Sequence, residues 1–260
     1  MEKGHCRMPR DRHKKPVATE NTFEDVAEKI KGRVPETIIN HEHDGSETTF
    51  NRRTLQIRTT PITIGIPQDE LMFSKFFSNF VNLSIMPWDG FIVTASTLVE
   101  QARNIINDTY LEKSHSPYLF MLDSDVLPPP NIIERLLADD KPVVGGFYRK
   151  KEKFPVKQLD GTMTTVQRPV VYDYSHYDEE KDRHLYNQRV DTKQGLEKVD
   201  GMGAGCWMIK REVIEAIGKS PFSLSQSGED LCFCRAVYEA GYEVWVDWDL
   251  PCAHCGVFWV

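Results

Sequence analysis

The sequence predicts an α/β fold, in which a mixed, mostly parallel sheet is flanked by helices on both faces. Short apolar runs without alternation, which are typical of strands buried on both sides, follow one another along the chain. Segments of helical periodicity lie between them, and strands that alternate with helices form parallel βαβ units. The chain has 260 residues, of which 40% are hydrophobic, and this is enough for one sizeable core.

The predicted elements begin near residue 61. The strands expected from the apolar runs are residues 62–67, 91–93, 118–122, 143–148 and 243–246. The helices expected from apolar spacing are residues 71–82, 97–111, 132–137, 208–217 and 230–240. The last two helices stop before Gly218 and Gly241, because glycine commonly follows the end of a helix.

Two regions depart from this rhythm. Residues 1–55 are polar and charged, with one short helix expected over residues 22–31, and we interpret them as an N-terminal extension that docks loosely or moves. Residues 56–260 then form the main domain. Within it, residues 151–196 are polar and rich in tyrosine, and we expect an insert with at most a hairpin or two, around residues 166–174.

Charge and composition exclude some classes of function. The net charge of -7 gives no sign of a protein that binds nucleic acid or acidic membranes. The sequence has no apolar run long enough to span a bilayer, and residues 1–15 lack the apolar core of a secretory signal. We therefore expect a cytoplasmic protein whose six cysteines are thiols or metal ligands.

The motif Asp123-Ser124-Asp125 follows the apolar strand 118–122 directly. In parallel α/β sheets, ligands bind beyond the carboxyl ends of strands. Alternate residues of an extended chain point the same way, so the two carboxylates can converge on Mg²⁺ or Mn²⁺ bound to a diphosphate. An acidic turn that closes the strand is the structural alternative.

Two further acids and a late histidine are candidates for the same site. Glu229 and Asp230 follow Gly228 at the start of a predicted helix, where acids also serve simply as caps. If they are functional, one of them is a general base that faces an acceptor hydroxyl. His254 follows the last predicted strand and can complete a metal shell, or it can be structural.

The loop Gly201-Met202-Gly203-Ala204-Gly205-Cys206 has three alternating glycines before an apolar segment. Its spacing is neither that of the dinucleotide-binding motif nor that of the P-loop. We expect the glycines to allow the backbone to approach a bulky ligand, such as a sugar. The basic run at residues 149–151 can face phosphate, although such runs are more often solvated charge.

Taken in order, these motifs resemble the GT-A glycosyltransferases, in particular the family-2-like group. The resemblance covers about residues 60–260. The segments that carry it are residues 102–104, 118–125, 144–148, 203–206, 228–230 and 254–256. It implies a Rossmann-like fold for nucleotide-diphospho-sugar transfer. The first strand ends at Pro67-Gln68-Asp69 rather than in the family's commoner run of small residues, which leaves the donor open.

The resemblance also implies a role for each candidate residue. Asp123 contacts the donor ribose and the metal, Asp125 binds the metal, and His254 joins the metal shell. Asp230 matches the catalytic base of inverting members, with Glu229 orienting the acceptor. The nucleotide sugar is held by residues from several segments, namely Pro67, Arg103, Asp123, Gly203, Ala204 and Gly205.

The resulting hypothesis is a metal-dependent, inverting glycosyltransferase that uses Mn²⁺ or Mg²⁺ and a nucleotide-sugar donor, with UDP-sugars favoured. The sequence does not identify the acceptor, which can be a saccharide, a protein, a lipid-linked molecule or a modified nucleic-acid base. The insert 151–196 is expected on the acceptor side, where its aromatic rings can stack on sugars or bases or form a mere surface excursion.

Three other interpretations compete with this one. A protein can keep the GT-A fold and bind sugar nucleotides without catalysis. Cys232, Cys234, Cys252 and Cys255 can form a structural zinc site, although two cysteines so spaced on a helix point in different directions. The segment Pro251–Cys255 also contains half of the zinc-deaminase signature, but the upstream half is missing.

Overall fold

The computed structural model describes residues 37–41, 47–51, 58–68, 72–95, 98–157, 162–224 and 227–256. The chain separates into two compact units, Met1–Pro35 and Glu36–Val260. The first unit, including the helix expected over residues 22–31, lies outside the described residues. The boundary expected after residue 55 stays a prediction.

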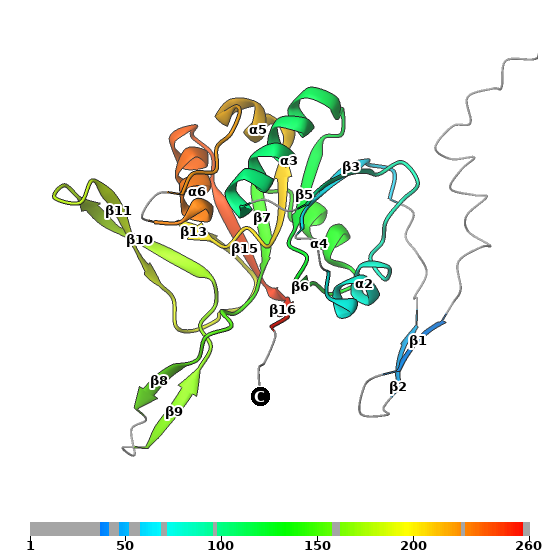
Figure 1. The fold of residues 1–260 in the computed structure, drawn as a ribbon, viewed down its shortest axis with the longest axis horizontal. Coiled ribbons are helices and arrows are strands. Elements are labelled where there is room, and N and C mark those ends of the chain that lie inside the picture. The colour runs from blue at the N-terminus through cyan, green and yellow to red at the C-terminus, as the bar shows by residue number, and fades with distance from the viewer. Residues whose placement is uncertain are drawn as a thin grey trace, which may run out of the picture. The chain divides into compact units, whose positions relative to one another are not determined.

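A seven-stranded sheet forms the centre of the domain, in the order β12-β15-β7-β14-β5-β3-β4 (Figure 1). Pairing shows that β4, β3, β5, β7 and β15 run in one direction, while β14 and β12 run in the other. The predicted mixed, mostly parallel sheet is thus confirmed. The strands are β3 (Ile62–Pro67), β4 (Gly90–Thr94), β5 (Tyr118–Leu122), β7 (Val143–Phe147), β12 (Leu196–Val199), β14 (Cys206–Lys210) and β15 (Val244–Pro251).

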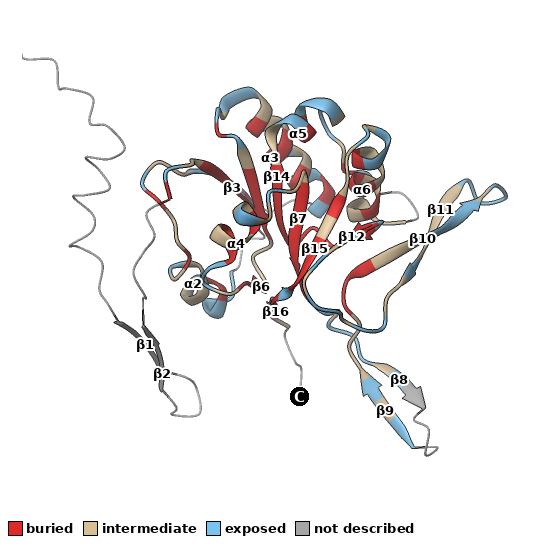
Figure 2. Cartoon of the chain, turned by 180° about the vertical axis from the view of Figure 1, so that it is seen from behind, coloured by how far each residue is buried: buried red, intermediate tan, exposed pale blue. Residues whose placement is uncertain are grey.

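Helices cover both faces of this sheet. The helices are α2 (Ser74–Phe80), α3 (Val99–Lys113), α4 (Ile132–Asp139), α5 (Arg211–Ile217) and α6 (Glu229–Glu239). Side chains from α3, α5 and α6 belong to one buried cluster, and side chains from α2 and α4 to another. The side chains of β5 alternate between the two clusters: Leu119 joins the first and Phe120 the second. This explains why the strand is apolar throughout. Figure 2 shows the same burial in the neighbouring central strands β7 and β14.

The prediction of a helix starting at Met208 was wrong. Met208 and Ile209 lie on β14, which pairs antiparallel with both β5 and β7, and the helix α5 begins only at Arg211. The run from Cys206 to Ile209 is buried completely or almost completely, so both faces are apolar. Periodicity cannot distinguish so short a run from the start of a helix.

The insert after β7 contains two hairpins. One joins β8 (Phe154–Lys157) to β9 (Met163–Val166), and the other joins β10 (Val171–Asp178) to β11 (Arg183–Gln188). A short strand, β13 (Gly201–Met202), pairs with the start of β10. The expected segment around residues 166–174 is the passage between the two hairpins and the start of the second.

Two small pairs of strands complete the described structure. β6 (Val126–Leu127) pairs antiparallel with β16 (Ala253–His254), and the latter follows β15 near the end of the chain. The N-terminal strands β1 (Thr37–His41) and β2 (Glu47–Asn51) form a hairpin. Among the described residues, no helix is both long and apolar enough to cross a bilayer.

Candidate active site

The candidate site lies where parallel strands of the sheet end. Pro67 is the last residue of β3, and Asp123 follows the last residue of β5. Since these strands are parallel neighbours, their carboxyl ends meet at one edge of the sheet. A cavity of about 310 Å³ opens there, lined by Pro67, Gln68, Val99, Ala102, Asp123, Ser124 and Asp125. The structure therefore brings Pro67 to the two aspartates, as the sequence predicts.

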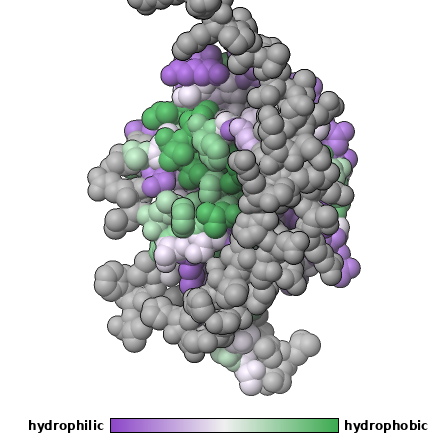
Figure 3. Space-filling view, turned by 90° about the vertical axis from the view of Figure 1, so that its right-hand side faces the viewer, coloured by the Kyte–Doolittle hydropathy of each residue, from purple (hydrophilic) through white to green (hydrophobic). Residues whose placement is uncertain are grey.

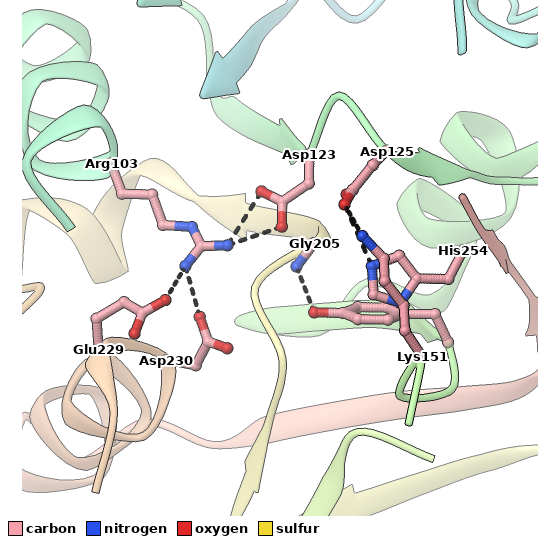
Figure 4. A network of polar contacts seen from close by, with 9 residues as sticks. Arg103, Asp123, Asp125, Lys151, Gly205, Glu229, Asp230 and His254 are labelled. Atoms are coloured by element: carbon pink, nitrogen blue, oxygen red, sulfur yellow. Dashed lines mark hydrogen bonds and ion pairs between the residues drawn. The ribbon is translucent and has the colours of Figure 1, made fainter. Parts of the chain in front are cut away.

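One buried arginine joins three carboxylates at this edge (Figure 4). Arg103 donates from one nitrogen to both oxygens of Asp123, at 3.0 and 2.8 Å. Its other terminal nitrogen donates to Glu229 at 2.6 Å and to Asp230 at 2.8 Å. The side chain of Arg103 is only 3% exposed, whereas the three carboxylates are between 18% and 23% exposed. The guanidinium is thus a fixed centre with acids arranged on its open side.

Local structure explains how these groups meet. Arg103 lies on the buried side of α3, together with Ala102, Ile106 and Tyr110. Gly228, which precedes α6, has a φ of 92°, a conformation that glycine adopts without steric penalty. This turn places Glu229 and Asp230 in the first turn of α6, where the helix dipole favours negative charge.

Burial and charge shift the pKa values of Arg103 and Asp230. Burial alone would lower the pKa of Arg103, but attraction to the carboxylates around it holds that pKa above its ordinary value. Burial raises the pKa of Asp230 to about 7, aided by repulsion from Glu229 and Asp123, although Arg103 acts in the opposite direction. Asp230 is therefore a carboxylate that exchanges a proton near neutral pH, as a general base requires.

A second group of contacts surrounds Asp125. His254 lies on β16, and the pairing of β16 with β6 places its Nε2 atom 3.4 Å from Asp125 Oδ2. Lys151 donates to the same oxygen at 2.6 Å. Burial alone would raise the pKa of Asp125, but hydrogen bonds from His254 and Lys151 outweigh it and hold that pKa below its ordinary value.

The hydrogen bond on the far side of His254 determines which atom faces Asp125. His254 Nδ1 lies 2.9 Å from the carbonyl oxygen of Arg149, and a carbonyl only accepts, so Nδ1 carries a proton. Nε2 is then the atom that faces the carboxylate, and it donates to Asp125 when it carries a proton. When it carries none, two acceptors face each other, and a cation between them would bind both. This arrangement suits a metal ligand that is oriented by a backbone carbonyl.

The glycine loop has a structural role that the sequence analysis did not anticipate. A Cβ atom added at Gly203 would overlap the ring and hydroxyl of Tyr148, and one at Gly205 would lie 2.9 Å from the same ring. The Gly205 N–H group donates to the Tyr148 hydroxyl at 3.2 Å. These glycines make room for a buried tyrosine. The neighbouring residue Ala204 hydrogen-bonds Asp230 through its backbone, which ties the loop to the acids.

The predicted metal ligands occupy two separate sets of contacts. Asp125 and His254 lie together, whereas the carboxylate of Asp123 is held by Arg103. Within the described residues, no three His, Cys, Asp or Glu side chains surround a common point. The four cysteines of the zinc hypothesis are not assembled either. Cys234 belongs to the core cluster on one face of the sheet and Cys252 to the cluster on the other.

Two residues of the site were not predicted from the sequence. Tyr148, at the end of a predicted strand, contacts His254 edge-on, with 5.0 Å between ring centroids. Lys151 ends the basic run that the sequence analysis interpreted mainly as solvated charge. The signal available for both was their position directly after β7, the strand that ends beside β14 and β15.

A scan against protein-family models and a search of curated proteins found no match. Solved structures do resemble the chain. A197 from STIV aligns over 76% of this chain and 87% of its own, with 21% identity and a TM-score of 0.50. GalNAc-T7, a glycosyltransferase solved with UDP, GalNAc and Mn²⁺, aligns over 76% of this chain, with 13% identity and a TM-score of 0.50.

The fold is that of the GT-A glycosyltransferases. The similarity extends over 43% of the GalNAc-T7 chain, so it concerns one part of that protein. At these identities the comparison shows the fold alone, and the chemistry has to be argued from the residues of this chain.

We predict that Arg103→Met destabilises the protein by about 3–5 kcal/mol at mildly alkaline pH, because it leaves three neighbouring carboxylates without their cation. Their pKa values in the folded variant would rise above those of the unfolded chain. The loss is therefore greatest when the carboxylates are ionised and shrinks as the pH falls. Urea unfolding at several pH values measures it.

The control is Arg235→Met, which removes an exposed pair between Arg235 and Glu239 on α6. It should change the free energy of unfolding by less than about 1 kcal/mol, with little dependence on pH. Equal losses in the two variants would contradict the central role of Arg103.

Proposed function

We propose that the protein is a metal-dependent glycosyltransferase that transfers a sugar from a nucleotide-sugar donor to an acceptor hydroxyl group. The observation that carries this proposal is the convergence on Arg103. It joins the aspartate that follows β5, beside the cavity at the end of β3, to the two acids that open α6. Donor-side and acceptor-side carboxylates are thus held by one buried cation. The GT-A fold supports the same class of activity.

The charge of the site suits a divalent cation. Four carboxylates, Asp123, Asp125, Glu229 and Asp230, face two cationic side chains, Arg103 and Lys151, in the contacts described above. Asp125 and His254 are the residues that would hold Mn²⁺ or Mg²⁺, with Asp123 on the same loop. Carboxylate oxygens and a backbone-oriented imidazole are fitting ligands for either ion. When bound, the metal offsets the negative charge that develops on the leaving nucleoside diphosphate.

The chain's own residues would supply the proton transfer. In its ionised form, Asp230 accepts the proton of the acceptor hydroxyl as that oxygen attacks the anomeric carbon. Arg103, which also pairs with Glu229, fixes its orientation, and the Ala204 backbone contact limits its movement. A base on the side opposite the leaving group gives inversion of configuration, which belongs to this proposal.

The donor nucleotide would occupy the cavity between Pro67 and Asp123, which is of the size typical of ligand sites. We favour UDP, because the GT-A structure that resembles this chain was solved with UDP and Mn²⁺. The resemblance to the family-2-like group is part of the same proposal. The backbone of Gly203, Ala204 and Gly205 would border the sugar.

The acceptor would approach from the insert. Tyr172 lies at the start of β10, and its pKa is raised to about 12 by burial and by the negative charge of Asp230. The insert therefore borders the proposed base. A saccharide, a protein, a lipid-linked molecule or a modified nucleic-acid base all offer a hydroxyl group for this chemistry.

The test needs no knowledge of the acceptor, because water can take its place. We expect one UDP-sugar of a panel to be hydrolysed with Mn²⁺ and to release UDP, measured by a coupled assay. Asp125→Ala should lower the rate by about 100-fold or more, since it removes charge stabilisation of the leaving group. Asp191→Ala, which changes an exposed carboxylate between β11 and β12, is the matched control.

Binding of UDP-sugar without turnover, under conditions that saturate the protein with donor and Mn²⁺, would instead favour a non-catalytic sugar-nucleotide module. Equal rates for Asp125→Ala and Asp191→Ala would remove Asp125 from the site. The UDP assay gives the rates, and isothermal titration with the UDP-sugar and Mn²⁺ measures the binding.

We also predict that kcat/KM rises with pH and levels off above about 7, because Asp230 accepts a proton only when ionised. Asp230→Asn should lower the rate by about 10²–10⁴-fold and abolish this acid limb. The donor should still bind to the variant, as isothermal titration with UDP and Mn²⁺ can show. A limb that persists unchanged in Asp230→Asn would assign it to another group.

A further inference from the structure

Lys151 holds the carboxylate that the proposed function assigns to the metal. Its Nζ atom lies 2.6 Å from Asp125 Oδ2, and the side chain is 43% exposed. The same oxygen is the one that faces His254 Nε2 at 3.4 Å. The close-up shows lysine and histidine converging on this single carboxylate (Figure 4). An ammonium group in this position repels any second cation that approaches Asp125.

A second cavity offers the Lys151 side chain a position away from Asp125. Lys151 also lines this second cavity, of about 610 Å³, whose wall includes residues of the insert and of β15 and β16. Arg149, Gln167 and His254 border this cavity as well. A long, half-exposed side chain can move into this space by rotating about its own bonds, without any change in the backbone.

We propose that Lys151 is an internal counter-ion of Asp125, which a divalent metal displaces when it binds. This inference rests on the proposed function, because it takes Asp125 and His254 as the metal site. Lysine and metal compete for one oxygen atom, so each weakens the binding of the other by the same factor. Metal binding thereby frees the Lys151 side chain from Asp125.

The first measurement is the affinity for Mn²⁺ alone, by isothermal titration on the full chain. We expect Lys151→Met to bind Mn²⁺ more tightly than wild type, by about tenfold, since the competing ammonium is gone. Lys153→Met changes an exposed lysine two residues away and should match wild type.

The second measurement follows Lys151 itself. Amine labelling of wild type, quantified at each lysine by mass spectrometry, should show faster labelling of Lys151 when Mn²⁺ is present and no change at Lys153. If Mn²⁺ binds to wild type but no more tightly to Lys151→Met, or leaves the labelling of Lys151 unchanged, the counter-ion proposal fails. If Mn²⁺ binds to neither protein, the metal-dependent function fails with it.

A separate observation concerns the outer edge of the sheet. β4 is the last strand of the order, with β3 as its partner. Exposed apolar side chains lie on β4, on α2 and its flanks, and on α3 with the residue before it, and Figure 3 shows an apolar area on this side of the molecule. We call these side chains, each between 36% and 58% exposed, the β4 edge patch. The patch consists of Phe73, Phe77, Val81, Phe91, Val93, Leu98, Val99 and Ile105. Open edge strands and large apolar patches are typical of interaction surfaces.

Among the described strands, β1 and β2 pair only with each other. They form a two-stranded sheet, and such a hairpin is at best marginally stable in water without further strands or a helix to pack on. Its tether ends beside β4, because Arg58 donates at 2.9 Å to Asp89, the residue before β4. The seven steps from Asn51 to Arg58 reach about 25 Å, which exceeds the ~17 Å length of a five-residue strand.

We infer that the β1–β2 hairpin docks along β4, covers the β4 edge patch and extends the sheet. The hairpin is favoured over a second copy of the chain, because a short tether gives it an effective concentration in the millimolar range.

Hydrogen exchange on the full chain tests this. We expect amides of β1, β2 and β4 to be protected together, at a monomeric mass by light scattering that is independent of concentration. Val93→Lys should abolish protection of the hairpin amides, whereas Val190→Lys, at a position 47% exposed beyond β11, should leave it intact. Unprotected hairpin amides in wild type, protection that survives in Val93→Lys, or protection that appears only with a doubled mass would overturn the inference.

Discussion

The rest of the site depends on the ion pairs that the buried guanidinium of Arg103 forms with three carboxylates. A carboxylate near the protein interior is stable only with a partner, and here one cation serves three of them. It links the end of β5, the face of α3 and the start of α6, which lie up to 127 positions apart in sequence. Burial and the two neighbouring carboxylates raise the pKa of Asp230 to about 7, and Arg103 opposes this shift without cancelling it.

Local signals in the sequence were enough to predict most of the sheet and to place the candidate residue Asp123 at the end of a buried strand. The bounds of β3 and β5 agree with the prediction, since each is a short apolar run bounded by polar residues or proline. The position of Asp123 beyond a buried strand is likewise a local feature. β14 was missed because its apolar run continues into α5 without a turn, and the strand is decided by pairing with β5 and β7.

The contacts within the site could not be predicted in the same way. That Arg103 reaches Glu229, or that Lys151 reaches Asp125, depends on tertiary packing between distant segments. The glycine loop shows the same limit. Three alternating glycines indicate that a bulky group comes close, but only the packed structure reveals that Tyr148 is such a group.

The reversed direction of β14 has a consequence for how such a centre is assembled. When all strands of a sheet are parallel, the chain only leaves strands at their carboxyl edge, and no strand begins there. A single reversed strand between β5 and β7 also brings an incoming segment to that edge, here Gly203 to Gly205. The outgoing loop at Asp123 and the incoming loop at Gly205 then lie side by side, and the Asp123 N–H group donates to the Gly205 carbonyl at 2.9 Å. Main-chain contacts thereby tie the loop that carries Asp123 to the segment whose Ala204 backbone hydrogen-bonds Asp230.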